Sequence, residues 1–284
     1  MKIINTMDNP NEKLLIDVEK VLASKNKKLA KRVPKFLYNL LKRIIHQDEI
    51  NEILLKYGHL EGVDFINKVY EHFNFKITVH GEENLAPDSR YIFVSNHPLG
   101  GLDGIILMHF IASKFGDVKA ISNDLLTNVK PLMPLFLPVN IYRNMSHEYA
   151  ENLINGYKSE TPILNFPAGL CSRKIKGEVK DLPWRKSFIK RAIDSQRDIV
   201  PVYFDGKNSN FFYNFANLRK FLGIKFNFEL LLLPDEMFKQ LNNSFDIYIG
   251  EPIKYESITN EYTYSEWTEI IREKAYNGRY NKTN

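Results

Sequence analysis

Hydrophobic residues in the first quarter of the chain recur at the spacing of amphipathic helices. Apolar side chains return every three or four positions, first from Leu14 to Val21 and then from Phe36 to Ile45. Few runs before residue 74 alternate between apolar and polar side chains as a half-buried strand does. The pattern therefore predicts an N-terminal helical segment over residues 1–74.

From Phe75 onward the pattern changes to short β-rich runs that alternate with helical stretches. The predicted strands are residues 75–80, 91–96, 118–122, 161–166, 198–204, 226–233 and 245–250. The apolar run at residues 104–115 is predicted to be a helix. Strands that alternate with helices indicate an α/β sheet, so residues 75–284 are expected to form one α/β domain.

The composition is that of an ordinary globular protein with a small excess of basic residues. The chain has 284 residues, of which 44% are hydrophobic and 26% charged, and this excludes a disordered or fibrous protein. Its formal net charge of +5 leaves nucleic acid, an anionic membrane and an acidic protein as possible partners. The single cysteine, Cys171, can form neither an internal disulfide nor a cysteine-based zinc site, which fits a reducing compartment. The chain has no run of about 18 apolar residues, and its first residues lack the apolar core of a secretory signal.

Positive charge is concentrated in two segments. Residues 25–45 carry eight Lys and Arg and no acid, with apolar side chains between them. This spacing is typical of a basic amphipathic helix on an anionic bilayer, although Pro34 interrupts the helix and an apolar helix face can equally pack on the α/β domain. Residues 172–191 carry eight basic residues against Glu178 and Asp181, directly after a Phe-Pro-Ala-Gly turn. They are candidates to line a site for a phosphate or a carboxylate.

The most informative stretch for chemistry is the turn between His97 and Asp103. His97 follows a buried strand run, Pro98-Leu-Gly-Gly cannot form regular structure, and Asp103 opens the apolar helix. A tight turn of this kind can bring the two side chains together. The carboxylate would then hold the imidazole Nδ1–H while Nε2 takes a proton from a hydroxyl. Two non-catalytic explanations stay open. Asp103 can be only the N-cap of the helix, and His97 can be only a structural residue at the end of the strand.

Motifs of other enzyme classes are missing from the sequence. It has no Gly-x-Gly-x-x-Gly and no Gly-Lys-Ser/Thr, so a nucleotide site has little support. It also has no Gly-x-Ser-x-Gly, and Ser95 lies inside a predicted strand, which disfavours a serine hydrolase. The aromatic residues fall mostly in apolar runs, with Phe226 and Phe228 expected on a strand face, so no nucleic-acid partner is expected.

Several motifs, in the same order along the chain, resemble those of the glycerolipid (lysophosphatidic acid type) acyltransferase superfamily. The resemblance spans about residues 75–253. Asn96-His97 and Asp103 resemble the Asn-His-x4-Asp motif, and Val139 to Arg143 resemble the acceptor-binding motif that ends in Arg. Phe166 to Gly169, followed by Arg173, resemble the Phe-Pro-Glu-Gly motif and the arginine after it. The strand around Pro201 and the strand end from Gly250 to Ile253 also resemble segments of the superfamily. Each motif is short, and their common order is what makes the resemblance specific.

The chain departs from the superfamily pattern at two positions. Five residues, not four, separate His97 from Asp103, and Ala168 stands where the superfamily has an acid. The extra residue falls in the Gly-Gly loop, where it can be absorbed, whereas loss of the acid alters the usual contact with a glycerol-phosphate acceptor. Both departures are similar to the hemolysin-like branch of bacterial acyltransferases, which includes O-acyltransferases that complete ornithine and glycine lipids from their lyso forms.

The resemblance implies a fold, a reaction and a location. The implied fold is a mixed, mostly parallel sheet flanked by helices, and the implied reaction moves a fatty acyl group from acyl carrier protein or acyl-coenzyme A to the hydroxyl of a lyso-lipid. The expected acceptor is a lyso-amino-acid lipid of the N-acylated glycine or ornithine type. The alternatives are lysophosphatidic acid acylation and, from another class, a non-enzymatic hemolysin-like membrane-binding protein. No cofactor or metal is implied, and the protein is expected on the cytoplasmic face of the inner membrane, peripheral or monotopic on an anionic surface.

The resemblance also implies roles for individual residues. His97 is the expected general base and Asp103 the residue that orients it. The expected substrate-binding residues are Asn96, Gly100, Gly101, Arg143, Phe166, Pro167, Gly169, Arg173 and Pro201. Among these, backbone N–H groups of the glycines would hold the oxyanion, and the arginines would bind an anionic head group or the carrier's phosphate. Cys171 is not expected to be a nucleophile, and residues 132–137 offer apolar side chains for either an acyl-chain groove or the core.

Overall fold

In the described part of the chain, four α-helices precede the sheet. The computed structural model describes residues 14–25, 27, 31–122, 129–138 and 147–280. The N-terminal helices are α1 (Val18–Lys25), α3 (Lys35–Ile44), α4 (Gln47–Tyr57) and α5 (Gly62–Phe73). Helix α3 begins directly after Pro34, so the proline interrupts the basic segment as its sequence indicates.

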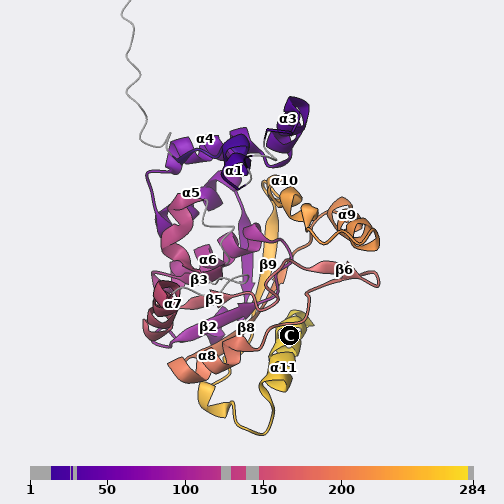
Figure 1. Ribbon diagram of the computed structural model, residues 1–284. Coiled ribbons are helices and arrows are strands. Elements are labelled where there is room, and N and C mark those ends of the chain that lie inside the picture. Colours follow the sequence, from indigo (N-terminus) through magenta and orange to yellow (C-terminus); the bar gives the residue numbers. More distant parts are fainter. Residues whose placement is uncertain (1–13, 26, 28–30, 123–128, 139–146, 281–284) are drawn as a thin grey trace, which may run out of the picture.

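A seven-stranded sheet forms the centre of the molecule (Figure 1). Its strands are β1 (Lys76–His80), β2 (Tyr91–Ser95), β3 (Lys119–Ser122), β4 (Phe136–Pro138), β5 (Ile163–Asn165), β8 (Asp198–Asp205) and β9 (Ser244–Ile249). The strand order is β1-β9-β8-β2-β5-β3-β4, and each neighbouring pair in it is parallel except β8 with β9. The predicted mixed, mostly parallel α/β sheet is confirmed.

Helices cover both faces of this sheet. Those that follow β2 are α6 (Gly101–Phe115), α7 (His147–Lys158), α8 (Ser187–Ser195), α9 (Asn210–Phe221), α10 (Leu233–Phe238) and α11 (Tyr264–Asn277). Phe93 of β2 packs in one core cluster with α5 and α6, whereas Ile92 and Val94 pack in a second cluster with α8 and α11. Because β2 is buried on both faces, its sequence is a nearly continuous apolar run.

One predicted strand is wrong. Residues 226–233 form the 3-10 helix η5 (Phe228–Leu232) and the start of α10, and the side chains of Phe226 and Phe228 are exposed instead of lining a strand face. Pro234 favours the first turn of α10, and a short apolar run cannot by itself distinguish a strand from a helical segment. A separate two-stranded hairpin consists of β6 (Arg173–Ile175) and β7 (Glu178–Lys180).

The N-terminal helices share their core with the sheet. Phe65, Ile66 and Phe73 of α5 belong to the same buried cluster as Phe93. The chain passes from α5 to β1 around residue 74, where the sequence predicts a domain boundary. Among the described helices, none combines the length and the apolar character needed to cross a bilayer.

Candidate active site

The candidate catalytic residues lie on the loop between β2 and α6. Strand β2 ends at Ser95 and α6 begins at Gly101, so the loop leaves the carboxyl end of a central parallel strand, where open α/β sheets bind ligands. Gly100 has a φ of +78°, and a Cβ at this position would lie 2.8 Å from Leu233 Cδ1. The tight turn therefore requires glycine at position 100.

This turn brings the two predicted catalytic side chains together. His97 Nδ1 lies 3.0 Å from Asp103 Oδ1. The two atoms do not meet the geometry of an aligned hydrogen bond, so the contact is a close electrostatic one that becomes an ion pair when the ring is protonated. Catalytic contacts are often poorly aligned before substrate binds. The extra residue in the loop does not keep the pair apart.

Asp103 is held as a buried carboxylate by the first turn of α6. Its side chain has no exposed surface, its Oδ2 accepts a hydrogen bond from Leu99 N at 2.9 Å, and its Oδ1 accepts one from Gly104 N at 2.8 Å. The amino end of a helix stabilises negative charge. Asp103 thus lies within α6 and not at the N-cap, which is Gly100.

The imidazole of His97 is fixed on two sides. Phe166 stacks on it with ring centroids 4.0 Å apart, and 17% of the His97 side chain is exposed. Burial has the largest single effect and lowers the pKa of His97, but the charge of Asp103, the direct contact with its carboxylate and the charge of Asp181 together outweigh burial, so the pKa is raised above 6.5. The ring therefore has one edge against a carboxylate and a raised affinity for a proton, as a general base requires.

A second buried carboxylate, Asp181, anchors the loop between β2 and α6 that carries His97. Its Oδ1 accepts hydrogen bonds from His97 N at 3.2 Å and from Ser172 Oγ at 2.5 Å, and its Oδ2 accepts one from Trp184 Nε1 at 2.8 Å. Burial raises the pKa of Asp181, and these hydrogen bonds lower it by less. In the sequence, Asp181 is distinguished only as an acid within a basic segment. The Asp-Leu-Pro-Trp run that contains it was the available signal.

The Phe-Pro-Ala-Gly turn packs directly beside His97. Gly169 has a φ of +70° and donates its N–H to Phe166 O at 2.9 Å, so this N–H is committed to the turn. Pro167 O accepts a hydrogen bond from Arg185 N at 3.0 Å. Ala168, in place of the superfamily's acid, is buried among apolar side chains. The turn therefore contributes the Phe166 ring to the site and no charge of its own.

Arg173 is close to the site but already has a partner. One of its terminal nitrogens, Nη2, lies 3.0 Å from Glu229 Oε1, and Glu229, which is fully buried, also pairs with Arg219 at 2.7 Å. The other terminal nitrogen donates to the carbonyl oxygen and the sulfur of Cys171. Burial raises the pKa of the Cys171 thiol, and Arg173 lowers it by less. The geometry thus leaves Arg173 in a buried ion-pair network and Cys171 as a buried thiol.

The remaining predicted site residues differ in their placement. Asn96 is buried, where its Nδ2 donates to Phe204 O at 3.0 Å and its Oδ1 accepts from Phe204 N at 2.7 Å, so it ties the loop to β8. Pro201 lies within β8, and its carbonyl accepts a hydrogen bond from Gly250 N at 2.8 Å. Gly101 is exposed at the first position of α6. Arg143 lies outside the described residues.

The residues considered for an acyl-chain groove divide between core and surface. Met133 is exposed on the 3-10 helix η4 (Lys130–Leu135). The others are buried, and they are Leu132, Leu135, Phe136 and Leu137. Three of these belong to the core cluster of α5 and α6 and Leu137 to that of α8 and α11, so most of this run serves the core.

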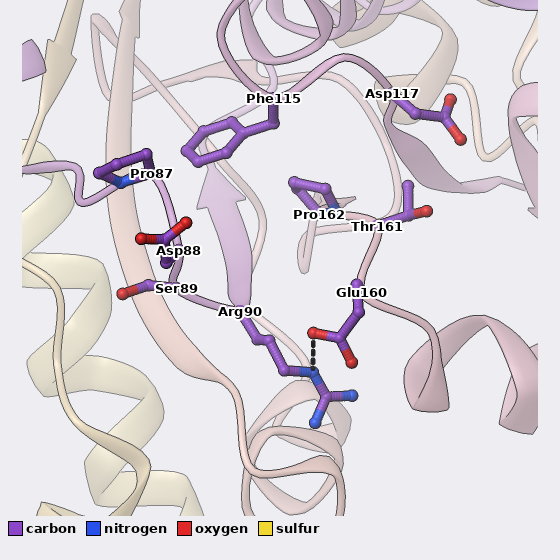
Figure 2. A pocket seen from close by; sticks show the side chains of 9 residues that line it. All are labelled: Pro87, Asp88, Ser89, Arg90, Phe115, Asp117, Glu160, Thr161 and Pro162. Carbon is purple, nitrogen blue, oxygen red and sulfur yellow. Dashed lines mark ion pairs between the residues drawn. The ribbon is translucent and has the colours of Figure 1, made fainter.

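Two cavities lie at opposite ends of the sheet. Figure 2 shows a cavity of about 410 Å³ whose lining includes Arg90 and Pro162, the residues that precede β2 and β5, so it lies at the amino ends of the strands, away from His97. A second cavity, of about 460 Å³, lies between the β6–β7 hairpin and the start of α9 and is lined by Lys174, Lys207 and Asn208 among others. Asn208 Nδ2 donates to Pro98 O at 3.1 Å, so this cavity borders the catalytic loop.

The chain is similar to several known proteins. A family model described as "Acyltransferase" matches residues 20–282. The chain is 43% identical over 263 residues to a lyso-glycine lipid O-acyltransferase of Bacteroides thetaiotaomicron, a match that covers 92% of this chain and 97% of that protein. A protein of the same name from Phocaeicola vulgatus is 42% identical, with 92% and 94% covered. The crystal structure of a 1-acyl-sn-glycerophosphate acyltransferase from Thermotoga maritima aligns with a TM-score of 0.49 and 18% identity, covering 88% of this chain and 98% of that one.

The matched residues run from the N-terminal helices to the end of α11 and include the whole catalytic loop. They confirm both the resemblance predicted from the motif order and the prediction of an acyl-transferring enzyme. The chain therefore belongs to the acyltransferase family.

Proposed function

We propose that the protein acylates the hydroxyl of a lyso-amino-acid lipid and that a lyso-glycine lipid is its acceptor. The observation that carries the proposal is the 3.0 Å contact between His97 and the buried Asp103 at the carboxyl end of β2. The acceptor class is suggested by the two relatives, whose name is lyso-glycine lipid O-acyltransferase. An N-acylated glycine offers no hydroxyl of its own, so the acylated hydroxyl lies on its N-acyl chain.

In the proposed mechanism His97 acts as a general base. Its Nε2 removes the proton of the acceptor hydroxyl as the hydroxyl oxygen attacks the thioester carbonyl carbon. The new ester C–O bond forms, the C–S bond breaks, and the imidazolium returns its proton to the leaving thiolate. Asp103 stabilises the positive ring between these two proton transfers.

The amino end of α6 is the proposed oxyanion site. The first N–H groups of a helix have no partner within the helix, and Gly101 stands at that position with open space where a Cβ would be. The N–H of Gly169 is less suitable, because it already donates to Phe166 O. Of the glycines predicted to bind the oxyanion, Gly100 and Gly101 are therefore the better supported.

The head group is proposed to bind in the cavity beside the hairpin. Lys174 and Lys207 line this cavity, in which the carboxylate of Glu236 is already paired with Lys239. The charge of Arg173, by contrast, is engaged by Glu229. An ammonium group beside a polar cavity suits a carboxylate. The buried Ala168 places no negative charge beside the site, so nothing at this position repels an anionic head.

The donor is proposed to be an acyl thioester on acyl carrier protein or coenzyme A. Both carry the acyl group on the same phosphopantetheine thiol, and direct transfer from it requires no cofactor. The exposed basic residues of the hairpin, such as Lys176, suit the phosphates and acidic surface of either carrier.

The N-terminal segment is proposed to hold the protein on the cytoplasmic face of the inner membrane. Helix α3 leaves the side chains of Phe36 and Leu40 exposed, with 72% of Phe36 accessible, and basic Lys35 and Arg43 lie on the same helix. Exposed aromatic residues among cations are typical of interfacial helices. The expected association is peripheral or monotopic.

The deciding experiment is lipid mass spectrometry of cells with and without the protein, followed by assay of the purified enzyme. Mono-acylated glycine lipid should accumulate and its di-acylated product should disappear when the protein is absent. Purified enzyme with a fatty-acyl donor should prefer N-acylglycine with a hydroxyl on its acyl chain to lyso-ornithine lipid and to lysophosphatidate. His97→Ala should abolish transfer without loss of the folded state.

Preference for lysophosphatidate would contradict the proposed acceptor while leaving the chemistry in place. Transfer by His97→Ala at the rate of the unaltered enzyme would falsify the mechanism. A protein that binds membranes but transfers no acyl group to any of the three acceptors would overturn the enzymatic proposal.

A further inference from the structure

Apolar side chains that the fold does not bury are concentrated between residues 211 and 231. Phe221 is 87% exposed and Phe226 is 62% exposed, although both are large aromatic residues. The exposed apolar residues of this stretch, defined here as the α9–η5 surface, are Phe211, Leu218, Phe221, Leu222, Ile224, Phe226, Phe228 and Leu231. Helix α9 and η5 contact each other, so these exposed residues lie on neighbouring elements, and large exposed apolar patches mark interaction sites.

Helix α9 has two apolar faces, and the fold uses one of them. Phe212, Tyr213 and Ala216 are buried and attach the helix to the molecule. The exposed residues Phe211, Leu218, Phe221 and Leu222 recur at the spacing of a second helical stripe. Packing therefore does not account for this stripe.

The charges of the segment are basic wherever they are exposed. Glu229 is the one acidic residue between Gly206 and Pro234, and it is fully buried in its pairing with two arginines. Lys207, Lys220 and Lys225 are exposed. Apolar side chains bordered by lysines without an exposed acid are complementary to anionic lipid head groups above an acyl layer.

The α9–η5 surface is joined to the catalytic loop at two points. Asn208, which precedes α9, donates to the carbonyl of Pro98, the residue after His97. Leu233, which follows η5, lies against Gly100, where a Cβ would be 2.8 Å from it. In Figure 1 α9 and α10 lie on the side of the molecule that carries the β6–β7 hairpin, across the sheet from α7.

We propose that the α9–η5 surface docks on an anionic bilayer and brings the catalytic loop to the lipid acceptor. This membrane contact is separate from the one proposed for the N-terminal segment. Its role in orienting the loop that carries His97 rests on the proposed function, since only a lipid acceptor requires the loop to face the bilayer. A second copy of the chain is less complementary, because a symmetric contact would place the lysines of the two copies against each other. An anionic bilayer offers an apolar layer and opposite charge together.

The test compares vesicle binding by the full chain and its variants. Vesicles of phosphatidylethanolamine with phosphatidylglycerol serve as the anionic probe, and phosphatidylcholine vesicles as the neutral one. Replacement of Phe221, Leu222 and Phe226 by serine should lower the partition coefficient on anionic vesicles by about tenfold or more. Lys220→Gln with Lys225→Gln should weaken binding to anionic vesicles, more so at low salt, and leave binding to neutral vesicles unchanged.

The matched control is Ile154→Ser on α7, an exposed apolar residue on the far side of the sheet, with 40% of its surface accessible. It should bind vesicles as the unaltered chain does. If the triple variant loses its cooperative thermal transition, Phe221→Ser alone is used, since its side chain has few contacts to lose. The proposal would be overturned if the Phe221, Leu222 and Phe226 variants bound vesicles as well as the Ile154→Ser control. It would also be overturned if light scattering showed that these variants change the oligomeric state while their vesicle binding is unaltered.

Activity separates this proposal from the proposed function. The surface variants should lose transfer to a long-chain acceptor in vesicles and keep transfer to a short-chain, water-soluble N-acylglycine that carries a hydroxyl on its acyl chain. If the unaltered enzyme acylates neither acceptor while the variants still lose vesicle binding, the proposed function fails and the docking surface stands. If the variants lose both activities equally but bind vesicles normally, the docking surface fails.

Discussion

At the scale of single residues, the charges that face His97 determine its chemistry. Asp103 lies 3.0 Å from Nδ1, Asp181 holds the backbone N–H, and Phe166 covers one ring face. The carboxylates outweigh burial and raise the pKa of the ring. A raised pKa also stabilises the folded protein, an effect fully present below pH 6.5 and lost as the pH rises through the folded-state pKa of His97.

The pH profile tests this assignment. Because the base must be neutral, kcat/KM should fall as the pH drops through the pKa of His97. This pKa is raised above 6.5, so the fall should begin above pH 6.5. Asp103→Asn should move this limb to lower pH and reduce kcat by about 10²–10⁴-fold. Steady-state kinetics across the neutral pH range on a saturable soluble acceptor measure both effects. A limb that stays in place in Asp103→Asn would show that another group titrates.

The head-group cavity supports a prediction about affinity. Lys174→Gln with Lys207→Gln should raise KM for N-acylglycine with a hydroxylated acyl chain by about tenfold and change kcat little, because both lysines line the cavity and neither takes part in the His97–Asp103 contact. Lys190→Gln, an exposed lysine of α8, is the control and should change neither constant. An equal loss of kcat in the double variant would place these lysines in the chemical step instead.

At the scale of elements, the turn from β2 into α6 depends on glycine at one position but not at the next. Gly100 combines a φ of +78° with a close approach to Leu233, whereas a Cβ on Gly101 would meet no atom within 4 Å. The two neighbours therefore provide a matched pair. The same loop is held by Asn96 to β8 and by Asp181 to the segment after β7.

Substitution of the two glycines should separate these effects. Gly100→Ala is expected to lower the free energy of unfolding by about 1–3 kcal/mol and to reduce kcat, because the loop must shift away from Leu233. Gly101→Ala should change stability by less than about 0.5 kcal/mol. Urea unfolding of both variants measures the difference. Equal stability of the two would contradict the assigned turn geometry.

At the scale of the whole molecule, α5 and the sheet share one buried cluster, to which no described side chain of α1 or α3 belongs. Phe73 is fully buried, and removing a buried phenylalanine side chain alone typically costs about 3–5 kcal/mol. The predicted boundary near residue 74 therefore separates helices from strands in the sequence. It does not separate two buried cores.

Two shortened chains test this organisation. A chain that begins at Phe75 should lack a cooperative unfolding transition, because it exposes the surface that α5 covers. A chain that begins at Gln47 should retain the transition and bind anionic vesicles more weakly, since it lacks α3 with its exposed Phe36. Circular dichroism in urea and vesicle flotation provide the readouts. Cooperative unfolding of the chain from Phe75 would support an independent α/β domain.

The local sequence was sufficient to predict β2, the turn after it and α6. The reason is that a buried apolar run, a Gly-Gly loop and a helical apolar repeat each restrict the backbone within a few residues. The motif order was likewise sufficient to predict the family. The segment at residues 226–233 was predicted wrongly because its apolar run fits a strand and a helical turn equally well.

Contacts between distant residues were decided only in the folded molecule. Asp181 reaches His97 across 84 residues, and Glu229 takes up the charge of Arg173 across 56. Which stripe of α9 is exposed depends likewise on what packs against the other. Spacing along the chain determines local conformation and brings His97 close to Asp103. Partners, burial and exposed faces follow from how the elements are packed, because side-chain energies depend on neighbours that the linear order does not specify.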